Sequence, residues 1–220
     1  MKSVKQYIFE KLKVKQTTYT LFPKTKEELK QMIKDEISKN GNECSLNHID
    51  VSEITDMSSL FSESDFNGDI SNWDVSNVEN MAWMFKDSKF NGDISKWDVS
   101  KVESMYSMFY NSIFNGDISN WDVSNVENME YMFIESLFNG DISKWDVSNV
   151  RTMYWMFRES KFTGDISKWD VSNVLNMVYM FYKSKFNGDI SNWNVSNVID
   201  MHGMFNNSPL ENNPPKWYKK

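Results

Sequence analysis

Residues 90–109 read Phe-Asn-Gly-Asp-Ile-Ser-Lys-Trp-Asp-Val-Ser-Lys-Val-Glu-Ser-Met-Tyr-Ser-Met-Phe, and close copies of this stretch fill most of the chain. The copies repeat with a fixed period of 24 residues. A period of this length is typical of a solenoid, in which each unit buries its apolar face against its neighbours. The phase extends back to Ile49 and forward to Trp217, where Pro214 and Pro215 break the pattern. The same period places tryptophan at Trp73, Trp97, Trp121, Trp145, Trp169 and Trp193.

Methionine and phenylalanine follow the same period. Of the 15 methionines, all but Met1 and Met32 fall in two columns that run through the repeats. Of the 15 phenylalanines, all but Phe9 and Phe22 do the same. Apolar residues at a fixed repeat position are typical of a core, so we expect these columns to be buried.

Each unit has the pattern of a short helix. Ser76 and Glu79 have the spacing of a capping box, which marks a helix start. The apolar residues Met81, Met84 and Phe85 then follow at the spacing of one helical face. We therefore expect a helix near residues 77–87 and its equivalents, either α or 3₁₀, that depends on packing against neighbouring coils.

The other half of the unit has the pattern of a turn followed by a strand. Asn91 and Gly92 tolerate left-handed backbone angles, and Asp93 can bind its own backbone. Residues 94–99 then alternate as in a short strand, with Trp97 and Val99 on one side. The predicted fold is an α/β, leucine-rich-repeat-like solenoid of about seven coils over residues 49–220, each a short parallel strand plus a short helix, with a C-terminal half-repeat as a cap.

The repeat unit resembles that of BspA-like leucine-rich-repeat surface proteins, also known as the mycoplasma-type lipoprotein repeat of unknown function. The motif is Phe-Asn-Gly-Asp-Ile-Ser-x-Trp-Asp-Val-Ser-x-Val-x-x-Met-x-x-Met-Phe, and it covers about three quarters of the chain. The resemblance implies a leucine-rich-repeat-like solenoid, association with a bacterial or protist surface, and adhesion or protein binding. It implies no catalytic residues.

Residues 1–48 do not repeat. Helical spacing over residues 2–13, alternation over residues 18–22 and a helix start at Thr25 predict a helix, a short strand and a second helix ending near Gly41. We expect this α/β segment to cap the first coil. The alternative is that the basic helix over residues 2–13 recruits a partner or an anionic surface.

Composition argues against several functions. The net charge is −7, divided as +4 over residues 1–48 and −11 over the rest, which disfavours nucleic-acid binding. A single cysteine, Cys44, and two histidines, His48 and His202, at opposite ends of the repeats leave no support for a zinc site or a histidine-based triad. Turn formation accounts for the Asn-Gly-Asp motif without calcium. We expect no enzyme activity, cofactor or metal.

The positions that vary among the repeats are the candidate binding site. If residues 77–87 are helical, Glu79, Trp83 and Lys86 project outward together. Exposed aromatic side chains favour binding, although neighbouring coils could use the same side chains to cover each other. The predicted binding residues are Trp83, Tyr106, Tyr110, Tyr131, Tyr154, Trp155, Tyr179 and Tyr182.

We therefore expect a non-catalytic scaffold that binds a protein partner through this aromatic stripe on the helix side. A glycan-binding or adhesion module and a structural component, such as a virion protein, are the alternatives. The chain has no signal peptide and no run of about 18 apolar residues, which predicts a cytoplasmic protein without a membrane span. The alternative is association with a surface or a virion, through the family resemblance or by another route. The oligomeric state stays open.

Overall fold

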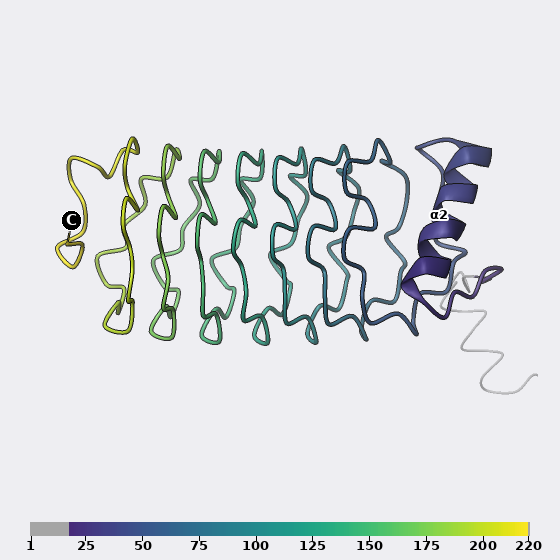
Figure 1. Ribbon diagram of the computed structural model, residues 1–220, viewed down its shortest axis with the longest axis horizontal. Coiled ribbons are helices and arrows are strands. Elements are labelled where there is room, and N and C mark those ends of the chain that lie inside the picture. The colour runs from purple at the N-terminus through teal and green to yellow at the C-terminus, as the bar shows by residue number, and fades with distance from the viewer. Residues whose placement is uncertain (1–17, 220) are drawn as a thin grey trace, which may run out of the picture.

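The computed structural model describes residues 18–219 and shows 24-residue coils stacked along one axis (Figure 1). Helix α2, Lys26–Asn40, covers one end of the stack, and the C-terminus lies at the other. Single parallel bridges join each coil to the next at equivalent positions. The bridges that form the longest series join Asp56, Asn80, Ser104, Asn128, Thr152, Asn176 and Asp200.

The predicted α/β solenoid is wrong. Within residues 18–219, α2 is the one helix, and the coils contain isolated bridges and turns without a sheet. The repeats are present, but neither a helix nor a strand forms inside them. The coil-to-coil hydrogen bonds explain both differences.

The predicted helix over residues 77–87 is a series of turns. The amides of Met81, Trp83 and Phe85 donate to carbonyls of the next coil at 2.8–3.0 Å. The alternate amides of Met84 and Lys86 donate three residues back, at 3.2 Å. Trp83 has a φ of 57°, in the left-handed region. Every second amide is thus directed out of the coil, so the hydrogen bonds of an α-helix cannot form. We call this segment and its equivalents the turn ladder.

The predicted strand over residues 94–99 is also wrong, because the chain turns. The amide of Trp97 donates to the carbonyl of Ile94 at 3.2 Å. One carboxylate oxygen of Asp93 accepts from the amide of Ser95 at 2.9 Å and from its hydroxyl at 2.7 Å. This local bonding competes with an extended backbone. Trp97 and Val99 are nevertheless both buried, as the alternation predicted.

The predicted core columns are confirmed, except that Met201 in the last coil is half-buried. Phe85 and Phe109 stack with centroids 5.7 Å apart, and both are fully buried. Tryptophan adds a hydrogen bond between coils, because Nε1 of Trp121 donates to the carbonyl of Ile94 at 3.1 Å. Trp217 repeats this bond with Ile190 at 2.9 Å, so the phase continues to the end of the chain.

The glycine of the Asn-Gly-Asp motif leaves space for a phenylalanine ring in the core. Contrary to the sequence prediction, Gly92 is not among the residues with positive φ. A Cβ at Gly92 would lie 2.8 Å from two ring carbons of Phe90, which is itself fully buried. The glycine is needed because the phenylalanine ring occupies the place of a side chain.

The N-terminal segment packs onto the first coil. Thr25 caps α2 by accepting from the amide of Glu28 at 3.2 Å, and Gly41 ends it with a φ of 83°, which confirms the second predicted helix. Leu29 and Ile33 are buried within the same core as the coils. The predicted helix 2–13 lies outside the described residues. The division at residue 48 stays a prediction.

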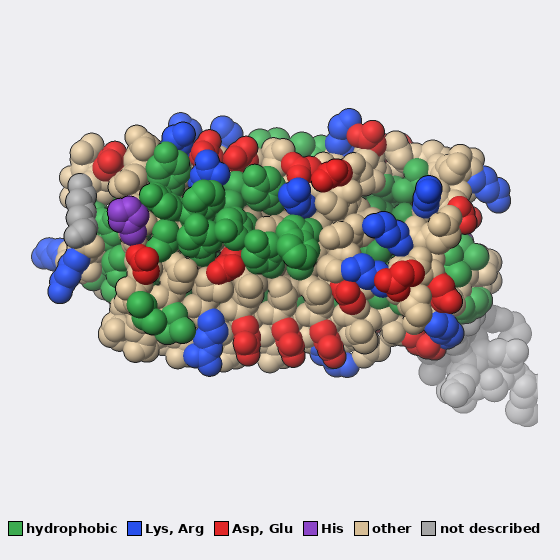
Figure 2. Space-filling model, viewed as in Figure 1, with side chains coloured by type: hydrophobic (Ala, Val, Ile, Leu, Met, Phe, Trp, Pro, Cys, Tyr) green, Lys and Arg blue, Asp and Glu red, His purple; other side chains and the backbone are tan. Residues whose placement is uncertain are grey.

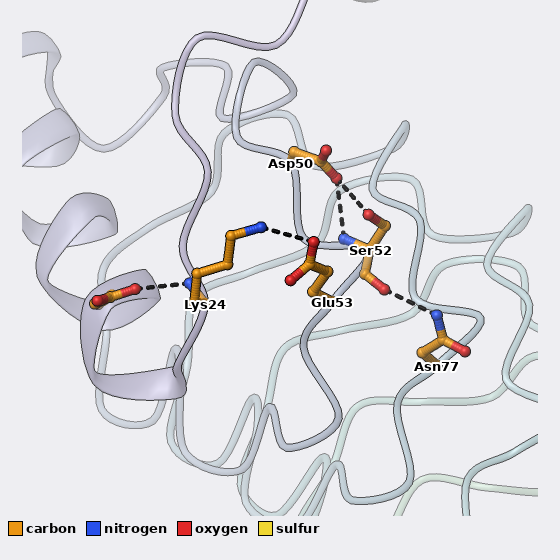
Figure 3. A network of polar contacts seen from close by, with 6 residues as sticks. Lys24, Asp50, Ser52, Glu53 and Asn77 are labelled. Carbon is orange, nitrogen blue, oxygen red and sulfur yellow. Dashed lines mark hydrogen bonds and ion pairs between the residues drawn. The ribbon is translucent and has the colours of Figure 1, made fainter.

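Polar contacts lie at this junction and in the coil beside it (Figure 3). Nζ of Lys24 donates to Glu53 at 2.6 Å. Asp50 accepts from the hydroxyl of Ser52 at 2.7 Å, and the side-chain Nδ2 of Asn77 in the next coil donates to the carbonyl of Ser52 at 2.9 Å. The predicted strand 18–22 is reduced to one parallel bridge, at Leu21.

Candidate interaction surface

The predicted aromatic residues lie on the turn ladder, on one side of the stack. Figure 2 shows hydrophobic side chains gathered on this side beside a row of acidic ones. Trp83 contacts Tyr106 with centroids 4.9 Å apart, and Tyr106 contacts Tyr131 at 5.2 Å. The contacts continue through Tyr154, Trp155, Tyr179 and Tyr182. We call these seven residues, together with Tyr110, the aromatic face.

Most rings of the aromatic face meet edge to face. Trp83 and Tyr106 are inclined by 70°, whereas core rings such as Phe85 and Phe109 are inclined by 8°. Trp83 is 41% exposed, and the other seven side chains are half-buried. The seven contacting rings therefore cover their neighbours and still present surface to solvent, and their role in binding stays a prediction.

The backbone under the aromatic face is unusual for large side chains. Trp83, Tyr131, Trp155 and Tyr179 all have φ between 53° and 59°. Each such residue costs roughly 1–2 kcal/mol relative to a right-handed conformation, and glycine avoids the cost. Gly203 occupies the same position in the last coil. The turn ladder requires this conformation, but it does not require an aromatic side chain.

One edge of the aromatic face is lined by cations of the chain itself. Lys86 lies 5.7 Å from the ring of Tyr110, which has no aromatic neighbour among the described residues. The guanidinium of Arg158 lies 4.5 Å from the ring of Trp155. An open hollow of about 230 Å³ is lined by Trp155, Arg158, Tyr179 and Tyr182. Arg158 is also paired with Glu159 at 2.7 Å, so its charge is balanced.

The other edge is acidic. Glu79, Glu103 and Glu127 are exposed, one in each of three successive coils, and backbone hydrogen bonds of 2.8 and 2.9 Å join them. The same position then reads Arg151, Leu175 and Ile199, of which Ile199 is 82% exposed. We call Glu79, Glu103 and Glu127 the glutamate row.

Two members of this surface, Glu130 and His202, were not predicted from the sequence. Glu130 accepts from the hydroxyl of Thr152 at 2.7 Å, and the His202 ring lies 5.5 Å from that of Tyr179. Both occupy the position next to the left-handed residue, which Tyr106 and Tyr154 also occupy. The residue type at this position varies from repeat to repeat in the sequence, and this variation could have identified both residues as part of the surface.

Tyrosine pKa values report the environment at the acidic edge. Burial, together with the smaller effects of the nearby Tyr154, Tyr106 and Glu130, raises the pKa of Tyr131 to about 12. Burial and then the charge of Glu130 also raise the pKa of Tyr106. Burial and negative neighbours both disfavour a phenolate, so these phenols remain protonated at neutral pH.

Sequence comparison identifies the repeats. The profile of a family described as "Mycoplasma protein of unknown function, DUF285" matches residues 27–137 and 112–217. The chain belongs to the DUF285 family. The match supports the mycoplasma-type part of the resemblance and leaves the BspA-like leucine-rich-repeat part unconfirmed. Neither the curated proteins nor the solved structures contain a match to the chain.

The repeated carboxylates of this DUF285 chain have a structural role. Asp93 and Asp98 each accept from the amide of the serine two residues later, at 2.9 and 3.1 Å. The same bond recurs at Asp117, Asp141 and Asp165. These hydrogen bonds hold the pKa of Asp93 below its usual value, mainly through the amide of Ser95. In the described residues these repeated Asp side chains thus stabilise the turns of the coils, and their hydrogen bonds differ little from one coil to the next.

The chain also lacks a membrane-spanning helix in the part that the structure describes, because α2 is too short and too polar to cross a bilayer.

Proposed function

We propose that this DUF285 chain is a non-catalytic scaffold that binds a protein partner through the aromatic face. The observation that carries the proposal is the run of ring contacts from Trp83 to Tyr182, built on a left-handed backbone that favours smaller residues. Tryptophan and tyrosine offer large contact areas with few rotatable bonds, which suits protein recognition.

Ring geometry favours a protein over a glycan. A sugar ring stacks on an aromatic face that is open to solvent. Trp155 has Tyr154 stacked nearby, with centroids 5.4 Å apart, and Arg158 at 4.5 Å from its ring. Elsewhere the contacting rings are inclined to one another by 63–82°. An uneven surface of this kind suits the interlocking side chains of a protein partner.

A peptide-display selection against the intact chain tests the proposal. We expect the enriched peptides to bind the wild-type chain and to lose at least tenfold in affinity for a Trp83→Ser/Tyr131→Ser/Tyr179→Ser variant. Phe22→Ser is the matched control, because Phe22 is 52% exposed and lies in the N-terminal segment. Urea unfolding of each variant verifies that it is folded. Equal binding to the folded triple variant would overturn the proposal.

A further inference from the structure

The two edges of the aromatic face differ in how their charges are balanced. At the edge of Lys86 and Arg158, each cation lies near a ring and is paired with a carboxylate, at 2.9 Å to Asp87 and 2.7 Å to Glu159. Lys183 likewise lies 5.3 Å from the ring of Tyr182. The chain itself thus supplies the cations at this edge.

The glutamate row has no such partners. Within residues 18–219, Glu79, Glu103 and Glu127 form no ion pair, and no cation lies over the rings of Tyr106 or Tyr131. The three glutamates line a shallow groove together with Lys101 and Asn125. The ammonium group of Lys101 donates to Asn77 at 2.7 Å and is the one cation among the described residues that line this groove. Arg151 follows Glu127 in the next coil, so the row bears three carboxylates in succession before a cation.

Like charges at this spacing disfavour the isolated stack. Successive glutamates are joined through backbone hydrogen bonds, so their backbones are separated by about 4.8 Å, the spacing of neighbouring strands. Like charges placed directly opposite each other are destabilising. Glu130, beside Tyr106 and Tyr131, adds a fourth negative charge at the same edge. A cation supplied from outside would relieve this repulsion.

We infer that the partner presents a basic segment, whose Lys or Arg side chains pair with the glutamate row and lie over the rings of Tyr106 and Tyr131. This inference rests on the proposed function and specifies its partner. A cation over a tyrosine ring and an ion pair beside it reinforce each other. Beyond Arg151 the row becomes apolar at Leu175 and Ile199, so the basic part docks on the N-terminal half of the face.

The spacing of the glutamates favours a helical segment. Three coils span about 9.6 Å, whereas two turns of an α-helix span about 10.8 Å and four residues of a strand about 13.4 Å. A helix with Lys on one side and Leu on the other would keep its charges close to all three carboxylates, with its apolar side toward the rings.

The probe is a labelled amphipathic peptide of about 18 residues, a length at which a helix becomes stable, with Lys and Leu on opposite helical faces. Fluorescence anisotropy with the full chain should show binding that weakens as salt is added. A peptide with Glu in place of Lys should bind at least tenfold more weakly. A scrambled peptide of the same composition should also bind more weakly, since it has no separate faces.

Charge reversal locates the contact. Glu103→Lys/Glu127→Lys should weaken binding of the basic peptide at least tenfold. The control Glu27→Lys/Glu43→Lys changes the net charge equally at the N-terminal end of the stack and should change binding less than twofold. If the reversed variant does not fold, Glu103→Gln/Glu127→Gln replaces it.

An equal loss in both charge variants would overturn the inference, because it would mean that net charge alone attracts the peptide. Equal binding of the acidic peptide would overturn it as well. If ligands selected by display require Trp83 and Tyr131 but contain no Lys or Arg, the inference fails and the proposed function stands. If they bind the triple aromatic variant unchanged, the proposed function itself fails.

Discussion

Trp83 illustrates how the turn ladder constrains single residues. Its φ of 57° is left-handed, its ring is 41% exposed, and its aromatic contact is with Tyr106. Replacing Trp83 by Gly or by Ala removes the ring equally, but Gly also removes the backbone strain. We expect Trp83→Gly to be more stable to urea than Trp83→Ala by about 1 kcal/mol. If Trp83→Ala were the more stable variant, as is usual at a position inside a helix, the result would contradict the left-handed conformation of Trp83.

The buried tryptophans should respond differently from the exposed one. Trp121→Phe removes the Nε1 donor to the carbonyl of Ile94, which then keeps the amide of Trp97 as its donor. The expected loss of stability from the missing hydrogen bond is about 0.5–1.5 kcal/mol, with a further loss from the smaller ring. Trp83→Phe is the control and should cost less than about 1 kcal/mol, because Trp83 is partly exposed. Similar losses in both variants would indicate that the indole hydrogen bond contributes little.

At the level of the elements, the turn ladder and the helix predicted from the capping box lead to opposite expected effects of Glu103→Gln on stability. In the structure the glutamate row repels itself, so Glu103→Gln should raise stability by roughly 0.2–0.5 kcal/mol at about 0.01 M salt. The gain should vanish near about 1 M salt. Had Glu103 lain in the first turn of a helix, Gln would keep the capping hydrogen bond but lose the favourable interaction of the charge with the helix dipole, which would lower stability. Urea unfolding at both salt concentrations distinguishes the two.

The repeated Asp-to-Ser turns should make stability sensitive to acid. The hydroxyl and amide of Ser100 lower the pKa of Asp98, and those of Ser172 lower the pKa of Asp170. A lowered pKa in the folded state stabilises the fold above the unfolded value of about 3.9. This stability is lost as pH falls through the folded value.

Asparagine should keep these turns and remove their titration. Asn194 already accepts from the amide of Ser196 at 3.2 Å in the last coil. In Asp98→Asn/Asp170→Asn we expect the urea midpoint to fall less between about pH 5 and pH 3 than in the wild type. Glu27→Gln, on α2, is the control and should keep the wild-type dependence. An unchanged acid dependence in the double variant would exclude these carboxylates as its cause.

The sequence predicted which residues are buried, but not the backbone that buries them. The period of 24 was enough to identify the phenylalanine and tryptophan columns, because a stacked repeat aligns identical side chains. Apolar residues at Met81, Met84 and Phe85 fit a helix. The left-handed residues Trp83 and Asp87 show that the turn ladder repeats every four residues, close to the helical 3.6. Side-chain periodicity alone therefore does not distinguish the two.

The aromatic face was predicted for a related reason. Its residues occupy the positions that vary among repeats, and this variation is visible without a structure. The inclined rings, the uneven balance of charge at the two edges and the part played by Glu130 depend on contacts between coils. Such contacts join residues 22 to 27 positions apart, as in the bond from Thr152 to Glu130 or from Trp121 to Ile94. Local patterns could not supply them.

At the level of the whole molecule, the residues that hold the coils together occupy different positions of the repeat from the residues proposed to bind a partner. Identical ladders of Phe, Trp, Asn and Asp hold successive coils together. Residues that differ from coil to coil are gathered on the turn ladder. The scaffold thus presents, at about 4.8 Å intervals, a row of positions that can change without altering the core. Binding specific to this DUF285 chain is expected there.

Hydroxyl-radical footprinting of the intact chain, with and without a peptide selected for binding, tests this claim most directly. The method measures the solvent access of individual aromatic side chains by mass spectrometry. We expect the ligand to slow oxidation of Trp83, Tyr106 and Tyr131 several-fold, and to leave Phe22 and Trp217 unchanged. Protection at Trp217 or Phe22, with unchanged oxidation of the aromatic face, would contradict the account.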